Sequence, residues 1–91
     1  MIDFSKYNNK KLRLTKMKDN VFNNEHPNNI NEGAIREGEV SIKMCNEHRC
    51  FFIHPTPTRF FHTSEVKKIE EMEGYDLAHT VNSVYKVEII D

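Results

Sequence analysis

The chain has 91 residues, of which 37% are hydrophobic and 30% are charged, and its formal net charge is -1 at pH 7. A chain of this length buries only about 60–65% of its surface on folding, so we expect residues 1–91 to form a single domain with one modest core. The nearly balanced charge argues against a protein that coats nucleic acid, which needs a large excess of Lys and Arg, and equally against an acidic mimic of DNA.

The first predicted element is a β-strand over residues 11–17. Leu12 and Leu14 alternate there with polar residues, which is the period of a half-buried strand. Because the segment 10–18 is rich in lysine, we expect the strand to lie at the edge of a sheet, where charge discourages pairing with other chains.

Residues 20–33 are predicted to be a long loop. They contain six asparagines and one proline. Asparagine side chains bond the local backbone and so compete with a regular ladder, to which proline cannot donate. A loop of this length in a small domain is typically either disordered or functional.

Residues 39–54 predict a β-hairpin. Apolar and polar residues alternate over 40–45, a turn-tolerant tetrapeptide follows, and a second apolar run covers 50–54. When Cys45 faces Cys50 across this turn, the apolar side chains of both strands point to one face. These inward residues are Ile42, Met44, Phe51 and Ile53.

The remaining segments give a connector, an ambiguous stretch and a strand. Pro55 and Pro57 are expected to end the strand and to make 54–58 a stiff connector. Apolar residues recur at every second position over 81–90, which predicts a long strand. The stretch 63–74 favours a short helix, because its apolar residues fall three apart between a Thr-Ser pair and a glycine.

Two motifs bear on the ambiguous stretch. They are Phe60-Phe61-His62-Thr63-Ser64-Glu65-Val66 and Thr80-Val81-Asn82-Ser83-Val84-Tyr85. Together they resemble a pattern in small, mostly uncharacterised β-rich proteins encoded by bacteriophages, in which an aromatic residue precedes Thr-Ser-x-Val and Thr-x-Asn-Ser-x-Tyr follows. The resemblance covers residues 60–87 and implies that the motifs lie on consecutive antiparallel strands, which makes 65–72 a strand and not a helix.

From these elements we expect an all-β domain of four to six antiparallel strands, arranged as a small antiparallel sheet or as an SH3-like barrel. The alternative is an α+β domain that carries one helix at 64–73.

The sequence also bears on the cellular location. No stretch reaches the roughly 18–20 apolar residues that cross a bilayer, and the first nine residues lack the apolar run of a signal peptide. We therefore expect a cytoplasmic protein with no membrane partner. Two cysteines are too few for the disulfide framework of a secreted mini-protein, so we expect free thiols.

Charge is distributed unevenly along the chain. Residues 1–20 carry six basic and two acidic side chains, which is +4, and residues 61–91 carry seven acidic and three basic ones, which is -4. We expect the two ends to attract each other or to lie on separate solvated faces. The alternative is a basic edge that binds phosphate or an acidic protein.

The densest set of potential metal ligands is Cys45, His48, Cys50 and His54. A structural zinc site needs four ligands that converge at about 2.0–2.3 Å, whereas the predicted hairpin places His54 roughly 13 Å along the strand from Cys50. We therefore expect no metal site and no cofactor.

A catalytic site is not expected either. Cys50 and five histidines offer the parts of a nucleophilic site, but the sequence contains no nucleophile elbow and no glycine-rich phosphate loop. Most glutamates lie in polar runs, which does not suit the buried carboxylate pair of a hydrolase. We therefore expect a protein that is not an enzyme.

The candidate site is a partner-binding surface at the hairpin turn and the connector that follows it. The apolar strand faces are needed for the core, and the segment 64–73 is largely charged. Arginine and aromatic side chains are the types that anchor protein interfaces and stack on bases. The residues predicted for this site are His48, Arg49, Arg59, Phe60 and His62.

For function, the resemblance implies a small phage protein that binds a host protein, such as a defence or transcription component, and inhibits or redirects it. One alternative is a β module that binds nucleic acid or a nucleotide through the same arginines and aromatics. Another alternative is a structural or virion-associated protein.

Overall fold

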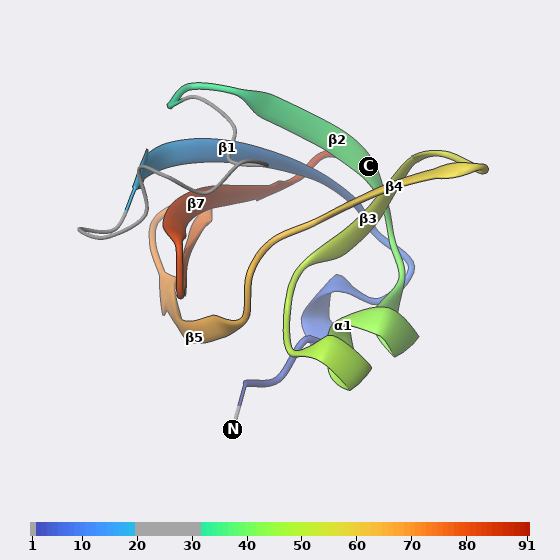
Figure 1. The fold of residues 1–91 in the computed structure, drawn as a ribbon, viewed down its shortest axis with the longest axis horizontal. Coiled ribbons are helices and arrows are strands. Elements are labelled where there is room, and N and C mark those ends of the chain that lie inside the picture. Colours follow the sequence, from blue (N-terminus) through green and yellow to red (C-terminus); the bar gives the residue numbers. More distant parts are fainter. Residues whose placement is uncertain (1, 20–31) are drawn as a thin grey trace.

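The computed structural model describes residues 2–19 and 32–91 (Figure 1). Residues 20–31, which make up most of the predicted loop over 20–33, lie outside the described part. The elements in chain order are η1 (Ser5–Tyr7, a 3-10 helix), β1 (Lys11–Asp19), β2 (Ile35–Val40), α1 (Ile42–His48), β3 (Phe52–Thr56), β4 (Arg59–His62), β5 (Val66–Glu71), β6 (Asp76–Thr80) and β7 (Ser83–Ile89).

The strands form one antiparallel sheet in the order β4-β3-β2-β1-β7-β6-β5. The sheet is strongly curved, and η1 and α1 lie between its two ends (Figure 1). The prediction of an all-β domain built on a small antiparallel sheet is therefore confirmed, and the described residues form seven strands in place of the four to six expected. In the described residues, the α-helix joins β2 to β3 and does not lie at 64–73.

The first strand forms as predicted but takes a different place in the sheet. Leu12 and Leu14 are fully buried, and β1 pairs with β2 on one side and with β7 on the other. The expected edge position is therefore wrong, because β1 is a central strand. Lys16 continues the inward series of this strand and is also buried, with its ammonium group paired to the carboxylate of Asp19.

The predicted hairpin of 40–45 with 50–54 is wrong. Residues 42–48 form α1, and β3 pairs with β2 so that Val40 lies opposite Ile53. Three alternating apolar residues fit a strand and a short helix equally well. The helix is favoured because its sequence contains lysine, methionine and glutamate, which are good helix formers.

The stretch 63–74 forms β5 and a turn, so the predicted helix is wrong and the strand implied by the resemblance is present. Val66 is buried and Ile69 packs against the core. A β-bulge between Val66 and Lys68 inserts one extra residue into the strand, so the two inward residues fall three positions apart instead of two. The bulge therefore explains why the sequence has a helix-like spacing here.

The proline connector is partly strand. β3 runs through Pro55 to Thr56 and turns directly into β4, so the prediction that Pro55 ends the strand and that 54–58 is only a connector is wrong. The pairing of β3 with β4 shifts register between Ile53 and Thr56, which is where a ladder tolerates a residue without an N–H. The predicted strand over 81–90 is confirmed as β7.

The core lies inside the curve of the sheet, around Phe51. The rings of Phe4 and Tyr7 meet Phe51 edge-on, with centroids 5.3 Å and 5.1 Å away. The Tyr7 hydroxyl donates a 2.5 Å hydrogen bond to the buried carboxylate of Asp76, which Lys6 also contacts. Burial, together with this hydrogen bond, raises the pKa of Tyr7 above its usual value. Of the four residues predicted to point inward, Phe51 and Ile53 are fully buried and Ile42 and Met44 pack partly buried against the core.

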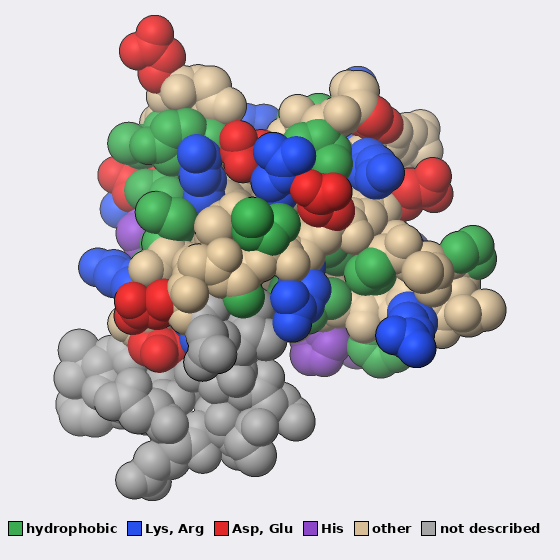
Figure 2. Space-filling model, turned by 90° about the horizontal axis from the view of Figure 1, so that it is seen from above, with side chains coloured by type: hydrophobic (Ala, Val, Ile, Leu, Met, Phe, Trp, Pro, Cys, Tyr) green, Lys and Arg blue, Asp and Glu red, His purple; other side chains and the backbone are tan. Residues whose placement is uncertain are grey.

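The two oppositely charged ends of the chain meet in the structure. Lys6 contacts Asp76 at 2.8 Å, and Arg13 lies 4.0 Å from Glu88 on the neighbouring β7. Figure 2 shows the same mixture on a larger scale, with Lys and Arg side chains beside Asp and Glu over the face drawn. Neither described helix is long and apolar enough to span a membrane.

Candidate functional site

A groove of about 500 Å³ lies between α1 and the hairpin of β3 and β4. Three of its lining residues carry aromatic or imidazole rings from the hairpin, and α1 supplies the facing wall. Glu65 is the acidic residue of the groove, and none of the described lining residues is a lysine or an arginine. The lining residues are Met44, His48, Cys50, Phe52, Phe60, His62, Thr63, Ser64 and Glu65.

The helical wall is held at both ends by backbone hydrogen bonds. The Cys45 N–H donates to the Ser41 carbonyl at 2.9 Å. At the other end Arg49 adopts the left-handed conformation (φ 54°, ψ 41°), and the Cys50 N–H donates to the Cys45 carbonyl at 3.3 Å. This Schellman arrangement ends the helix and turns the chain so that Phe52 enters the groove.

Three stacked rings form the opposite wall. Phe52 and Phe60 have ring centroids 4.9 Å apart and planes inclined by 13°, and His62 stacks on Phe52 at 5.9 Å. The register places Phe52 opposite His62, and Phe60 precedes His62 by two residues, so the strand period brings all three rings to one face. Phe52 is only 7% exposed whereas Phe60 is 59% exposed. Phe60 also stacks on His62, with centroids 6.0 Å apart, so the three rings form a cluster in which Phe60 is the exposed member.

The groove also holds polar groups at fixed positions. Nδ1 of His62 lies 2.9 Å from the Thr63 carbonyl oxygen, and because a carbonyl only accepts, Nδ1 donates there and Nε2 keeps its lone pair in the neutral ring. The carboxylate of Glu65 is contacted by Lys67 at 3.3 Å and by Arg49 at 3.9 Å. The groove thus presents the free ring nitrogen of His62 and a carboxylate that Lys67 and Arg49 contact.

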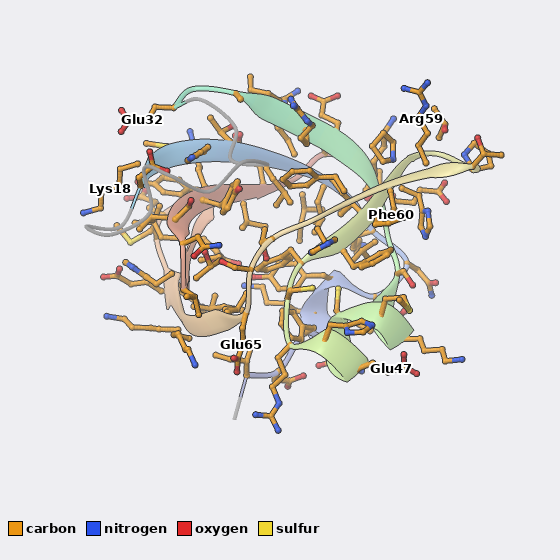
Figure 3. All side chains as sticks on the ribbon, in the orientation of Figure 1. Lys18, Glu32, Glu47, Arg59, Phe60 and Glu65 are labelled. Carbon is orange, nitrogen blue, oxygen red and sulfur yellow. The ribbon has the colours of Figure 1, made fainter. Side chains whose placement is uncertain are left out.

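The structure brings together three of the five residues predicted for the site. Arg49 does not line the groove but faces a second hollow beside Ile2 and Phe4. Arg59 is exposed and points away from Phe60 across the strand (Figure 3), because neighbouring strand residues lie on opposite faces. The predicted residues that do line the groove are His48, Phe60 and His62.

Sequence reasoning missed the helical side of the groove. Met44 and His48 are four residues apart, which places them on one face of a helix, but the segment was interpreted as a strand. Phe52 was also missed as the covered partner of Phe60. The spacing of Phe60 and His62 already shows that these two residues share a strand face, and a hairpin that pairs Phe52 with His62 adds Phe52 to that face.

Both cysteines are free and buried, with exposures of 0% for Cys45 and 3% for Cys50. The prediction of free thiols is therefore confirmed, but the two cysteines do not face each other across a hairpin turn, because Cys45 lies in α1. Burial, and to a lesser degree the neighbouring Cys45, raises the pKa of Cys50 to about 11. A thiol with this pKa is protonated at neutral pH, so Cys50 is a poor nucleophile.

We expect the protein to lose stability as the pH rises above about 9. An unfolded chain releases its thiol protons near pH 9.0, whereas Cys50 holds its proton to about pH 11 when folded. Between these values the unfolded state binds fewer protons, so the free energy of unfolding falls with pH. Urea titrations from pH 7 to 10.5 measure this, and Cys50→Ala should show a shallower fall relative to its own value at pH 7. An equally steep fall in that variant would contradict the assignment.

The residues first considered as metal ligands do not converge. Among the described residues, no three His, Cys, Asp or Glu side chains form a group that could hold a metal ion. Nδ1 of His54 bonds instead to the Arg59 carbonyl at 3.0 Å.

Comparisons of the chain with family models, with curated proteins and with solved structures gave no match. Function therefore has to be inferred from the groove itself.

Proposed function

We propose that this protein is a non-enzymatic binding protein that captures another protein by taking one of its apolar side chains into the groove between α1 and β4. In keeping with the resemblance to phage-encoded β-rich proteins, the partner is a host protein, such as a defence or transcription component. Binding inhibits or redirects that protein.

The observation that carries the proposal is the exposed ring of Phe60 stacked on the buried ring of Phe52. A large aromatic residue that is 59% exposed and held in place by stacking loses little freedom when a partner covers it, which is typical of an interface anchor. The groove beside it, at about 500 Å³, is large enough for one or two apolar side chains.

The edge of the sheet supports the same mode of binding. β4 is the end strand on this side, so the backbone groups on its outer side can pair with an extended segment of a partner. Such a segment would run beside Phe60 and could place every second side chain toward the groove.

A nucleic-acid or nucleotide ligand is the second candidate, because stacked rings are also the platform on which bases stack. The charges favour it less. Phosphate binding relies on lysine and arginine, whereas the charged residue among the described lining of the groove is Glu65. A structural role in a virus particle is tested separately, by looking for the protein in purified particles.

The test is affinity capture from host lysate with two adjacent substitutions on β4. Phe60→Ala should weaken capture of the partner by about tenfold or more, which is about 1.4 kcal/mol. Arg59→Ala is the matched control, since its side chain lies on the other side of the same strand, and it should change capture little. Nuclease-treated and untreated lysates distinguish a protein from a nucleic acid as the captured molecule.

Two results would contradict the proposal. Capture that is lost in Arg59→Ala but kept in Phe60→Ala would place the binding surface on the opposite face. Capture that disappears with nuclease treatment, and that weakens steeply with salt, would favour the nucleic-acid candidate.

A further inference from the structure

The other end of the sheet carries a strand whose sequence is complementary to itself. β5 is the end strand opposite β4, and it reads Val66-Lys67-Lys68-Ile69-Glu70-Glu71. We propose that two copies of this chain associate through β5, which pairs antiparallel with β5 of the partner copy around a two-fold axis at Ile69. This inference does not depend on the proposed function of the groove.

The outer edge of β5 has no described backbone partner along most of its length, and a hollow lined by Ile2, Lys6 and Tyr7 lies beside Ile69 and Glu71. Among the described residues, β5 makes one backbone hydrogen bond to a segment other than β6. In it the Val66 N–H donates to the Arg49 carbonyl at 2.7 Å. From Lys67 to Glu71 the strand pairs with β6 alone. An edge of this kind is a template for another strand.

The backbone fixes which residues can pair with a second copy. The Met72 N–H donates to the Tyr75 carbonyl at 2.9 Å, and backbone direction alternates along an antiparallel ladder. The backbone N–H and C=O groups of Lys68 and Glu70 therefore point to β6, whereas the backbone groups of Ile69 and Glu71 point away from β6, toward the outer edge. A two-fold axis at Ile69 makes Ile69 and its copy a hydrogen-bonded pair. This pairing is allowed because the backbone groups of Ile69 point outward, toward the second copy.

The same register pairs opposite charges. With Ile69 opposite its copy, Lys68 of each chain lies opposite Glu70 of the other, and Lys67 lies opposite Glu71. Lys68 is opposite Glu70 in a non-hydrogen-bonded pair, in which side chains come closest. A hydrogen bond from His79, and to a lesser degree the nearby Lys68, holds the pKa of Glu70 below its usual value, so this side chain is a carboxylate at neutral pH.

The next register that the backbone allows is disfavoured. Moving the axis to Glu70 would place Glu70 opposite its own copy, and like charges directly opposite each other are destabilising.

The experiment measures mass against concentration by analytical ultracentrifugation. The wild-type chain should move from 10.8 kDa to twice that mass as its concentration rises over about 1–500 µM, the range of a small, weak interface. In the same samples, hydrogen exchange at the amides of Ile69 and Glu71 should slow as the dimer forms. This measurement locates the interface without any substitution.

Charge reversal gives the specific test. Lys68→Glu and Glu70→Lys, each alone, place like charges opposite each other twice per dimer, and each should weaken association about tenfold or more. An equimolar mixture of the two variants restores opposite charges at both positions and should dimerise again. The control is Lys43→Glu on the exposed face of α1, which should leave association unchanged.

Three results would overturn the inference. The first is a wild-type chain that stays monomeric over the whole range. The second is a dimer in which the protected amides lie on β4 and not on β5. The third is a mixture of the two folded charge variants that remains monomeric, because this would show that the single substitutions act within one chain.

Discussion

Phe51→Ala is expected to lower the free energy of unfolding by about 3–5 kcal/mol, which is the usual cost of deleting a buried aromatic ring. Phe51 is fully buried and meets the rings of Phe4 and Tyr7 edge-on. Removing it leaves a cavity at the centre of the core and breaks the contact that holds η1 under the sheet. A domain of this size has a total stability of about 5–10 kcal/mol, so the variant should unfold at a much lower urea concentration.

The control for this prediction is Phe60→Ala. The same side chain is removed there from a position that is 59% exposed, so the loss of stability should be within about 1 kcal/mol. Circular dichroism during urea titration measures both variants. An unchanged transition midpoint for Phe51→Ala would show that Phe51 is not at the centre of the core.

Gly38→Ala is expected to cost about 3 kcal/mol or to prevent folding, because the added methyl group meets backbone atoms. A Cβ at Gly38 would lie 2.4 Å from the carbonyl carbon and oxygen of His54 and 2.7 Å from the nitrogen of Pro55. Backbone atoms of a paired strand cannot rotate away, so β2 and β3 would have to separate. The hairpin that carries Phe60 would move with β3.

Gly74→Ala separates this clash from the ordinary cost of replacing a glycine. Gly74 has a φ of +86° and open space around its Cβ position, so alanine there pays only for the left-handed backbone, about 1–2 kcal/mol. In thermal unfolding, the melting temperature of Gly38→Ala should therefore be lower than that of Gly74→Ala. The reverse order would mean that β2 and β3 are not packed as closely as described.

The strands that the sequence predicted correctly, β1 and β7, bury large apolar residues at alternate positions. These are Leu12 and Leu14 in β1 and Tyr85 and Val87 in β7, where the neighbouring Val84 is buried as well. β2 was missed because its buried inner residue is Gly38, and β6 because it buries Ala78, Asp76 and Thr80. Small or polar residues on a buried face leave no hydrophobic period to detect. The bulge in β5 altered the period itself.

The candidate site was predicted from its aromatic side only. Phe60 and His62 belong to one strand, so their spacing already places them together. His48 reaches the groove from α1, a segment that the sequence pattern predicted as a strand. His48 was therefore included in the predicted site for the wrong reason. Neither Arg49 nor Arg59 lines the groove. Arg49 ends the helix and only contacts Glu65 of the lining, and Arg59 faces the other side of β4.

The position of β1 between β2 and β7 has a consequence for the order of folding during synthesis. β1 pairs along most of its length with β7, so that Leu12 lies opposite Ile89, and contacts between residues this far apart in sequence form slowly. A ribosome adds about 5–20 residues per second, so β1 waits several seconds for its central partner. During that time the backbone edge of β1 that faces β7 is unpaired, and Leu12 and Leu14 lack the core side chains that β7 supplies, so both are open to chaperones or to other chains. A chain that stops before residue 83 would keep this edge permanently, and we expect such a fragment to be degraded or to aggregate.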